Sequence, residues 1–252
     1  MTATSAEQRQ VLILGGTSEI ALALAAALAS RDFGLILAGR DSAALEREAK
    51  DIELRYEVPV TVAHFEALDP DSHADFWQSL QPAPQGVVCA TGLLGDHNDA
   101  RRDFDHARRI LDTNLTGCIS VLDQAARHFE QAGEGFIIGI SSVAGDRGRA
   151  SNYYYGAAKA GFSTYLSGLR NHFASTGSRV RVITVKPGFV ATRMTAHHDT
   201  PALLTAHPEQ TARDIMRALQ GRRDVIYTRW YWRWIMLIIR LLPETIFKRT
   251  KL

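Results

Sequence analysis

The chain has few cysteines and no apolar run long enough to span a bilayer. Only 2 of its 252 residues are cysteines, Cys89 and Cys118, and both lie within short apolar runs. Two such residues predict buried thiols in a reducing compartment rather than a disulfide framework. The first ten residues are polar and lack the apolar core of a signal peptide, so we expect a cytoplasmic protein.

Excess charge of one sign is confined to the end of the chain. The net charge is +2, yet residues 222–252 hold eight Lys/Arg and two Asp/Glu, a local balance of +6. The preceding 221 residues therefore carry −4, which argues against nucleic-acid binding by the body of the protein. A basic, aromatic carboxyl-terminal segment instead suits an anionic membrane surface or a protein partner.

Short apolar runs alternate with helical patterns, and no repeat or linker interrupts them. With 46% hydrophobic and 22% charged residues, the composition is that of an ordinary globular protein. The alternation predicts right-handed crossovers and an α/β fold, a Rossmann-type doubly wound parallel sheet. The predicted strands are 11–15, 34–38, 58–65, 86–90, 136–140, 180–185 and 224–227, and the predicted helices are 20–30, 42–55, 71–80, 107–131, 153–175 and 208–220.

The segment 142–159 carries the clearest chemical signal. Tyr155 and Lys159 are four residues apart and share one helix face, and Ser142 precedes Tyr155 by thirteen residues at the end of an apolar run. A strand end and a helix start, joined by a glycine-bearing loop, bring the hydroxyl, the phenol and the ammonium together. Such a trio can hold a carbonyl oxygen and give it a proton. A helix with a surface tyrosine and lysine is the alternative.

A glycine turn follows the first predicted strand, with the sequence Gly15-Gly-Thr-Ser-Glu-Ile-Ala21. Such a turn exposes backbone N–H groups and the positive end of a helix, which suits a pyrophosphate. A full dinucleotide fingerprint has glycines where this chain has Glu19 and Ala21, so an ordinary turn with a capping serine is the alternative. The candidate cofactor-binding residues here are Gly15, Thr17, Ser18, Glu19 and Ile20.

The end of the second predicted strand indicates which dinucleotide binds. An acidic side chain at this position hydrogen-bonds the ribose 2′-hydroxyl of NAD. The chain instead has Gly39 and Arg40, and an arginine can pair with the 2′-phosphate of NADP. We therefore predict NADP(H) rather than NAD(H); a surface arginine beside the helix cap Asp41 is the alternative. Glu66, after the third strand, is either an acceptor for the adenine amine or a solvated carboxylate.

These residues resemble the short-chain dehydrogenase/reductase family across nearly the whole chain. The glycine turn, the segment Cys89-Ala90-Thr91-Gly92, Asn114, the Ser142/Tyr155/Lys159 set and the segment Pro187-Gly-Phe-Val-Ala-Thr192 stand in the family's order. The offsets also match: 28 residues from Asn114 to Ser142, 13 to Tyr155 and 4 more to Lys159. The chain departs from the family in having Cys-Ala-Thr-Gly for Asn-Asn-Ala-Gly and in lacking two turn glycines.

Both departures resemble a narrower branch, the decaprenylphosphoryl-2-keto-ribose reductases and their relatives. The matching segments are Gly-Gly-Thr-Ser-Glu-Ile, 67–73, 92–96, 193–197 and the tail 241–249. Enzymes of that branch reduce a keto group on a pentose carried by a polyprenyl phosphate. The resemblance leaves the substrate of this chain open.

The resemblance implies a role for each site residue. Tyr155 would be the general acid for the carbonyl oxygen, with its pKa drawn down from about 10 by Lys159 and the nicotinium charge. Lys159 would also hold the nicotinamide ribose, and Ser142 would bind the substrate oxygen. Asn114 would hold a proton-relaying water, the alternative being an asparagine bonded to backbone. The remaining predicted cofactor contacts are Glu66, Ala67, Ala90, Gly92, Asn114, Pro187, Gly188, Val190 and Thr192.

Thr192 would orient the carboxamide of the cofactor, although capping a loop helix is an equal alternative. No metal is required by such a reaction, and we read His197, His198 and His207 as exposed residues of a substrate-covering loop, 193–208. Asp96 and His97 would border the substrate, with their roles left open.

The tail is predicted to be separate from the Rossmann domain, which we bound at residues 1–229. Residues 230–242 contain three tryptophans, a tyrosine and seven aliphatic residues, but the segment is too short and too charged to span a bilayer. Arg233 and Arg240 are seven apart on one helix face, so 230–252 is typical of an amphipathic element lying in a membrane interface. Packing on the body, or on a second subunit of a homo-oligomer, is the alternative.

The leading hypothesis is an NADPH-dependent reductase of a ketone, with a lipid-linked keto-sugar as one candidate substrate. A reductase of a 3-oxoacyl group or another hydrophobic ketone is the first alternative. A non-catalytic dinucleotide sensor or scaffold subunit is the second, and the intact Asn/Ser/Tyr/Lys set argues against it, because a sensor has no need of Tyr155.

Overall fold

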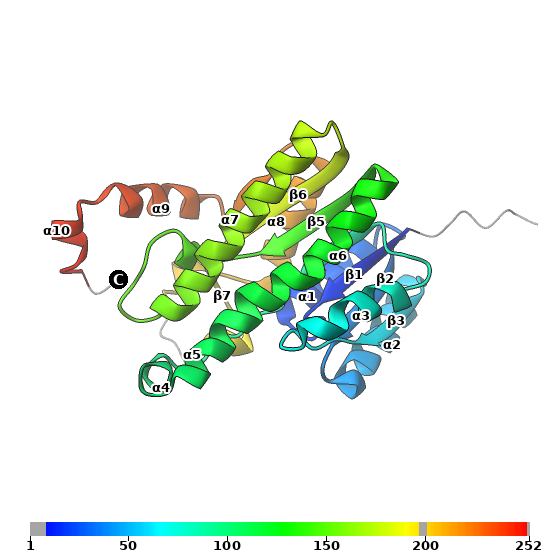
Figure 1. Ribbon diagram of the computed structural model, residues 1–252, viewed down its shortest axis with the longest axis horizontal. Coiled ribbons are helices and arrows are strands. Elements are labelled where there is room, and N and C mark those ends of the chain that lie inside the picture. Colours follow the sequence, from blue (N-terminus) through cyan, green and yellow to red (C-terminus); the bar gives the residue numbers. More distant parts are fainter. Residues whose placement is uncertain (1–8, 197–200, 251–252) are drawn as a thin grey trace, which may run out of the picture.

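A seven-stranded parallel sheet forms the centre of the molecule (Figure 1), shown as a computed structural model and described here for residues 9–196 and 201–250. Its strand order is β3-β2-β1-β4-β5-β6-β9, and every neighbouring pair is parallel. The doubly wound sheet predicted from the sequence is thus confirmed. Its strands are β1 (Gln10–Leu14), β2 (Gly34–Gly39), β3 (Val60–His64), β4 (Gly86–Cys89), β5 (Glu134–Ile140), β6 (Arg179–Pro187) and β9 (Val225–Thr228).

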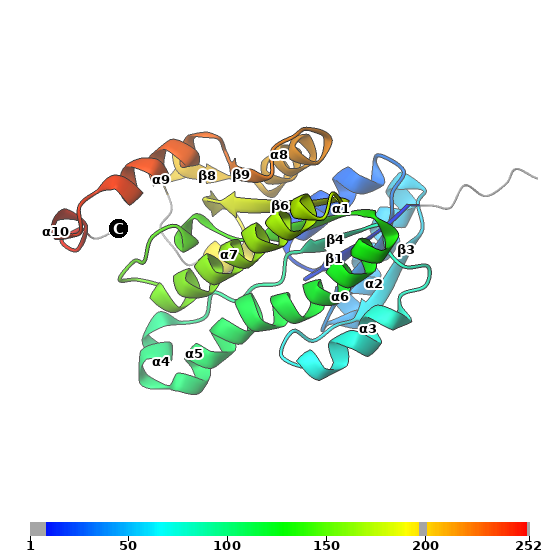
Figure 2. The same ribbon diagram turned by 45° about the horizontal axis from the view of Figure 1, so that its top comes forward.

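Helices cover both faces of the sheet, as Figure 2 shows from a second side. Successive strand residues point to opposite faces, so Val11 and Ile13 pack in one core and Leu12 and Leu14 in the other. The first core is closed by α1 (Glu19–Ala29), α2 (Ser42–Tyr56) and α8 (Pro208–Gln220), and the second by α3 (His73–Ser79), α6 (Gly117–Ala132) and α7 (Tyr153–Ser175). Burial on both faces explains why the strands are continuous apolar runs.

One predicted helix is wrong in its internal structure. The sequence pattern favoured a single helix over 107–131, whereas the chain forms α5 (Phe104–Leu111), a π-helical turn over Asp112–Thr116, and then α6. The separate helix α4 (His97–Arg102) was not predicted, because its six residues are too few to show periodicity. The π-helical turn lies at Asn114, and such turns are frequent at functional sites.

The carboxyl-terminal tail forms helix α9 (Tyr231–Leu241) and a single turn, α10 (Glu244–Phe247). Both lie beyond the carboxyl ends of the strands (Figures 1 and 2). Trp232, Met236 and Ile239 are buried on the body, in one cluster with Val143. Helix α9 therefore packs on the body of the protein through one of its faces. Among the described residues, no helix is long and apolar enough to cross a membrane.

Candidate active site

The glycine turn lies where the strand order reverses, between β1 and β4, the place at which doubly wound sheets bind ligands. Gly15 has φ +75°, and a Cβ there would lie 2.8 Å from the backbone nitrogen of Thr91. Only glycine fits this close approach. The hydroxyl of Thr91 is buried and has no hydrogen-bond partner among the described residues, so an outside ligand in this crevice would satisfy it.

The turn is built as a helix start with unused donors. Ser18 caps α1 by accepting a hydrogen bond from the backbone nitrogen of Ala21 at 3.3 Å. Within the described residues, the backbone N–H groups of Thr17 and Ile20 have no acceptor. Exposed N–H groups at the positive end of an eleven-residue helix fit an anionic pyrophosphate. The capping serine and the dinucleotide turn are therefore compatible interpretations, not competing ones.

Glu19, at the first position of α1, is paired with the loop after β6. Its carboxylate accepts hydrogen bonds from the backbone N–H and the side-chain Nε of Arg193, both at 2.9 Å. Burial raises the pKa of Glu19, but the hydrogen bonds from Arg193 outweigh burial, and the net effect is a lowered pKa. The electrostatic conflict that a glutamate would create beside a pyrophosphate is relieved by this pairing.

Arg40 and Asp41 stand at the carboxyl end of β2. Asp41 caps α2 by accepting from the backbone nitrogen of Ala44 at 2.9 Å. Arg40 is exposed and forms no ion pair within the described residues, so its guanidinium can reach a ligand. Glu66 accepts from the backbone nitrogen of Leu68 at 3.0 Å and is only partly exposed, and its neighbour Ala67 is buried.

Asn114 is fully buried in the π-helical turn. Its Nδ2 donates to the carbonyl oxygens of Leu93 at 2.6 Å and Ile110 at 2.8 Å. Its Oδ1 accepts from the backbone nitrogen of Leu93 at 3.2 Å. Asn114 thus bonds to backbone, the alternative raised by the sequence. A Cβ placed on Gly92 would lie 3.2 Å from this Oδ1 and 3.6 Å from Lys159 Nζ, so both side chains border Gly92.

Lys159 reaches the end of β5 from the face of α7 that carries Tyr155. It is 3% exposed, and its Nζ donates to the carbonyl oxygen of Ile140 at 3.0 Å. The same Nζ lies 5.7 Å from the ring centroid of the partly buried Tyr155. Ser141 Oγ donates to the carbonyl oxygen of Lys159 at 2.9 Å and holds the strand end on the helix.

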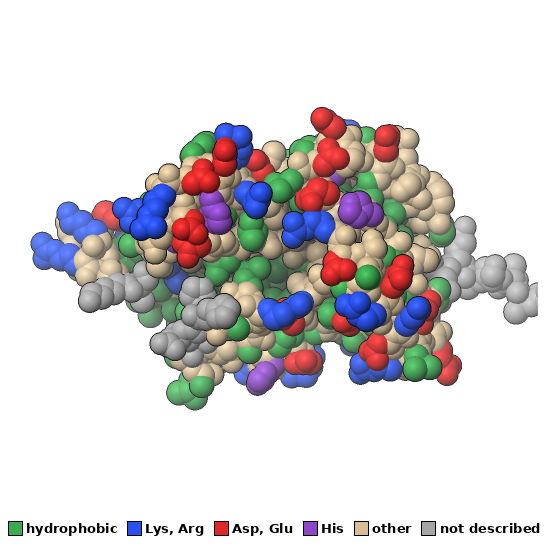
Figure 3. Space-filling view, turned by 90° about the horizontal axis from the view of Figure 1, so that it is seen from below, with side chains coloured by type: hydrophobic (Ala, Val, Ile, Leu, Met, Phe, Trp, Pro, Cys, Tyr) green, Lys and Arg blue, Asp and Glu red, His purple; other side chains and the backbone are tan. Residues whose placement is uncertain are grey.

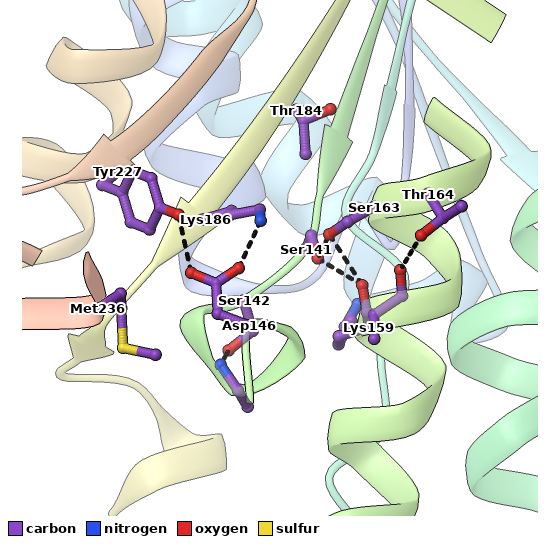
Figure 4. Close-up of polar contacts among 12 residues, drawn as sticks. Ser141, Ser142, Asp146, Lys159, Ser163, Thr164, Thr184, Lys186, Tyr227 and Met236 are labelled. Carbon is purple, nitrogen blue, oxygen red and sulfur yellow. Dashed lines mark hydrogen bonds and ion pairs between the residues drawn. The ribbon is translucent and has the colours of Figure 1, made fainter. Parts of the chain in front are cut away.

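Ser142 directly follows Ser141 and lies near Asp146 in the loop that leads to α7 (Figure 4). Its hydroxyl accepts from the backbone nitrogen of Ala144 at 3.1 Å. The short 3₁₀ turn after it, Val143–Gly145, packs tightly on α7, because a Cβ on Gly145 would lie 2.7 Å from the backbone nitrogen of Ala160. The structure thus brings the Ser142 loop onto the helix that carries Tyr155 and Lys159.

The segment after β6 contacts the tail. A Cβ on Gly188 would lie 2.0 Å from Trp232, so the indole rests on this glycine. Pro187 ends β6, and Val190 belongs to the two-residue strand β7 (Phe189–Val190), which pairs with β8 (Thr205–Ala206). Thr192 caps the 3₁₀ turn Arg193–Thr195, which is the capping alternative raised by the sequence.

Sequence reasoning missed a polar network beside the Ser142 loop. The Asp146 carboxylate, 2% exposed, accepts from Lys186 Nζ at 2.5 Å and from the Tyr227 hydroxyl at 2.8 Å (Figure 4). Burial, and then the bond to Asp146, raise the pKa of Tyr227. The network joins the loop to β6 and β9. Lys186 lies 40 positions after Asp146, and Tyr227 lies 41 positions after Lys186, so no local sequence pattern predicts the network.

Arg147, the next residue, holds the tail. Its Nη1 donates to the carbonyl oxygens of Ile239 and Leu242, at 2.5 Å and 2.6 Å, where α9 ends. Its Nη2 pairs with Glu244 at 2.9 Å, and the guanidinium lies 3.8 Å from the Phe247 ring centroid. A cation on the last carbonyls of a helix satisfies them and complements the helix dipole. The loop between Ser142 and Tyr155 is therefore attached to the tail.

The loop 193–208 is described only in part. His197 and His198 lie outside the described residues, and His207 caps α8. Asp96 caps α4, and His97 contacts Tyr153 edge-to-face, with ring centroids 4.4 Å apart. Within the described ranges, no group of three or more His, Cys, Asp or Glu residues is arranged to hold a metal ion. Cys89 and Cys118 are buried and unpaired by disulfides, as expected.

The parallel doubly wound sheet, with a glycine turn where its strand order reverses, defines a class, the dinucleotide-binding α/β oxidoreductases. The family model for short chain dehydrogenases matches residues 9–202. The chain belongs to the short-chain dehydrogenase/reductase family, and it is an NAD(P)-dependent oxidoreductase. An uncharacterized oxidoreductase of Mycobacterium tuberculosis is 37% identical over 242 residues, which cover 95% of this chain and 96% of that protein.

Other relatives and solved structures agree with this assignment. An uncharacterized oxidoreductase of Streptomyces coelicolor is 35% identical over 252 residues, covering 97% of each chain. A short-chain dehydrogenase from Sphingobium yanoikuyae in complex with NADPH matches with a TM-score of 0.81 at 21% identity, over 91% of this chain and 92% of that one. A short chain dehydrogenase from Burkholderia cenocepacia in complex with NADP matches with a TM-score of 0.80 at 20% identity, over 96% of this chain and 97% of that one. These two structures establish the fold.

Proposed function

We propose that this enzyme reduces a ketone to an alcohol with NADPH, with Tyr155 as the general acid. The observation that carries the proposal is the buried Lys159 ammonium, 5.7 Å from the Tyr155 ring and bordering Gly92 together with Asn114. A fixed positive charge beside a phenol favours the phenolate and eases loss of its proton. The dinucleotide, when bound, supplies the hydride.

The chain's own residues divide the remaining work. Ser142 donates a hydrogen bond to the carbonyl oxygen and aligns it with the Tyr155 hydroxyl, from which that oxygen takes a proton. Lys159 holds the ribose hydroxyls beside the phenol. Asn114 joins the loop after β4 to the π-helical turn through its two hydrogen bonds with Leu93, and so holds this loop in place beside Lys159. Hydrogen-bonded positioning of this kind contributes typically 10²–10⁴-fold to proton transfer.

The cofactor contacts follow from the crevice at β1 and β4. The turn from Gly15 to Ile20 would hold the pyrophosphate, and Arg40 the 2′-phosphate. Glu66 and Ala67 would border the adenine, with Ala90 and Gly92 beneath the nicotinamide half. Pro187, Gly188, Val190 and Thr192 would close the other side. The exposed guanidinium of Arg40, with no ion-pair partner in the described part of the chain, supports NADP over NAD.

Cofactor preference is tested by fluorescence titration of NADPH and NADH against the purified protein and against Arg40→Ala. One charge-assisted hydrogen bond is worth about 1.5–3 kcal/mol, so we expect NADPH to bind roughly 10- to 100-fold more tightly. Arg40→Ala removes most of that difference. Equal or tighter NADH binding by the unmodified protein overturns the assignment.

Reaction type is tested by NADPH oxidation with a panel of ketones that includes 2-keto-pentose derivatives, hydrophobic ketones and 3-oxoacyl thioesters. Turnover of any ketone supports the reductase, and a preference for the keto-pentoses supports the lipid-linked keto-sugar. A protein that binds NADPH tightly but reduces no ketone and oxidises no alcohol would instead be the non-catalytic sensor.

We further propose that α9 docks the enzyme on an anionic membrane, where a lipid-borne substrate is found. The face of α9 opposite the body carries Trp230, Trp234, Ile238 and Leu241, which are 70%, 55%, 64% and 73% exposed. These positions follow helical spacing and form one apolar stripe. Lys and Arg side chains gather at the tip formed by α9 and α10 (Figure 3), and near an anionic surface each cation contributes about 1 kcal/mol.

Docking is tested by co-sedimentation with phosphatidylglycerol vesicles at low and high salt. We expect binding that weakens with salt and is lost in the double variant Trp234→Ser and Ile238→Ser. Leu54→Ser is the matched control, because Leu54 is 84% exposed on α2, far along the chain from the tail. Protein that stays in the supernatant at both salt concentrations, or a stripe covered in a homo-oligomer seen by light scattering, overturns membrane docking.

A further inference from the structure

Arg149 lies in the loop between Ser142 and Tyr155 and is poorly satisfied. The residue is half-buried. Its Nε is inaccessible to solvent and has no hydrogen-bond partner among the described residues. Its Nη2 lies 3.7 Å from the Met236 sulfur, and a thioether is only a weak acceptor. A guanidinium withdrawn from water in this way is costly unless an oxygen acceptor binds it.

Two other arginines with limited exposure form hydrogen bonds to oxygen acceptors. Arg147 binds two carbonyl oxygens and Glu244, and Arg170 binds Val182 and Asp224 carbonyl oxygens and the Thr184 hydroxyl. Asp146 is close enough to influence Arg149, but both of its oxygens are occupied, one by Lys186 and one by Tyr227 (Figure 4). Burial accordingly lowers the pKa of Arg149, and Asp146 offsets this effect only in part.

A second unsatisfied donor stands on the same side. Trp232 lies one helical turn before Met236 on the buried face of α9, and its Nε1 has no partner in the described chain. Its ring rests on Gly188, at the segment that follows β6. The ring edge that carries Nε1 packs directly on Gly188, so this donor is covered by the chain itself, and Arg149 is the donor here that a group from outside the chain can bind. The acceptor Asn152 Oδ1, also buried and unpartnered, lies three residues further along the loop.

We propose that Arg149 binds an oxyanion of the substrate, a carboxylate or phosphate carried close to the reacting carbonyl. The inference rests on the proposed reductase function. Arg149 belongs to the loop that joins Ser142 to α7, and the first turn of that loop packs on α7, so a group bound by Arg149 lies on the same loop as Ser142. The planar guanidinium matches either oxyanion with two parallel hydrogen bonds. Arg149 thereby selects charged ketones over neutral ones.

Selectivity is measured with three matched ketones that differ only in a neutral, carboxylate or phosphate substituent. For the unmodified enzyme we expect kcat/KM to be about 10- to 100-fold higher for at least one charged ketone than for the neutral one. Arg149→Met, which keeps an unbranched apolar stem but removes the guanidinium, removes that ratio, and Arg149→Lys restores part of it. Arg55→Met is the control for overall charge, because Arg55 is exposed on α2.

An unchanged charged-to-neutral ratio in Arg149→Met overturns the proposal, as does an equal fall of the ratio in Arg55→Met. Binding is measured separately by calorimetric titration of inorganic phosphate into the NADPH-saturated protein. Weaker phosphate binding in Arg149→Met alone supports the oxyanion site even if no ketone is turned over, which would refute only the reductase. Ketone turnover with neither a charge preference nor phosphate binding refutes only the oxyanion site.

Discussion

Helices α7 and α9 both border the active site, but different forces hold their side chains. On α7, Tyr155 and Lys159 are one helical turn apart, and Lys159 is held by the carbonyl oxygen of Ile140. On α9, the buried residues Trp232 and Met236 are held by the Ser142 loop and by Gly188, elements far away in sequence. The residues of the proposed reaction are therefore related by short-range spacing, whereas the contacts of the tail depend on long-range packing.

The two helices also differ in what they leave exposed. Of the α7 residues to which we assign the proposed chemistry, Lys159 is only 3% exposed and Tyr155 is partly buried. Helix α9 buries one apolar face and exposes another, with Ile238 at 64%. A single amphipathic helix needs only one apolar face to pack on its own domain. The second face of α9 is therefore available for a surface outside the chain.

The largest effect is expected on the α7 side of the comparison. Tyr155→Phe removes only the proton donor, so we expect turnover to fall at least 100-fold. NADPH affinity, measured by fluorescence titration, should change by no more than about threefold, because the lysine remains. Tyr153→Phe, on an exposed residue of the same helix, is the matched control. Residual activity above about one hundredth would remove Tyr155 from the role of acid.

The attachment of α9 is tested by Arg147→Met. This change removes two charge-assisted hydrogen bonds to the end of α9 and the contact with the Phe247 ring. We expect the free energy of unfolding in urea to fall by about 2–4 kcal/mol. Arg233→Met removes an exposed cation from the same helix and should change stability by less than about 0.5 kcal/mol. Equal effects of the two substitutions would show that Arg147 does not anchor the tail.

The contact between α9 and the segment after β6 is tested by Gly188→Ala. The new methyl group would overlap the Trp232 ring, which should cost about 1–3 kcal/mol of folding free energy. Gly168→Ala in α7 is the matched control, because nothing lies within 4 Å of its added Cβ; it should stabilise by about 0.4–1 kcal/mol. Combining Gly188→Ala with Trp232→Leu should cost less than the sum of the single changes. Strict additivity would disprove the contact.

The smallest effect concerns Glu19 and Arg193, which join the glycine turn to the loop after β6. Because the pKa of Glu19 is lowered in the folded protein, the pair stabilises the fold above the ordinary carboxyl pKa, and the gain disappears as pH falls through the folded pKa. Arg193 is 76% exposed, so screening limits the gain to about 0.2–1 kcal/mol. Glu19→Gln should be less stable at about pH 7 and equal to the parent at about pH 3. A difference that persists in acid would contradict the pairing.

Several long elements were predictable because burial on both faces of a sheet leaves its mark on the sequence. The continuous apolar runs of β1 and β2, and the helical patterns between them, indicated parallel strands with crossovers. The π-helical turn at Asn114 was not predictable. Its sequence, Asp-Thr-Asn-Leu-Thr, is compatible with an ordinary α-helix, and the wider turn depends on hydrogen bonds from Asn114 to Leu93, outside the helix.

The sequence by itself determined the fold class and the family, and it supplied the proposed set of Ser142, Tyr155 and Lys159, because strand burial, helical periodicity and fixed offsets are local properties of the chain. Only the tertiary structure decided that Arg147 holds the tail while Arg149, two residues on, lacks an oxygen acceptor within the described residues. In the sequence Asp-Arg-Gly-Arg the two arginines have nearly the same surroundings. Their difference arises from α9, about ninety residues later, since a guanidinium's function depends on the acceptors that folding brings to it.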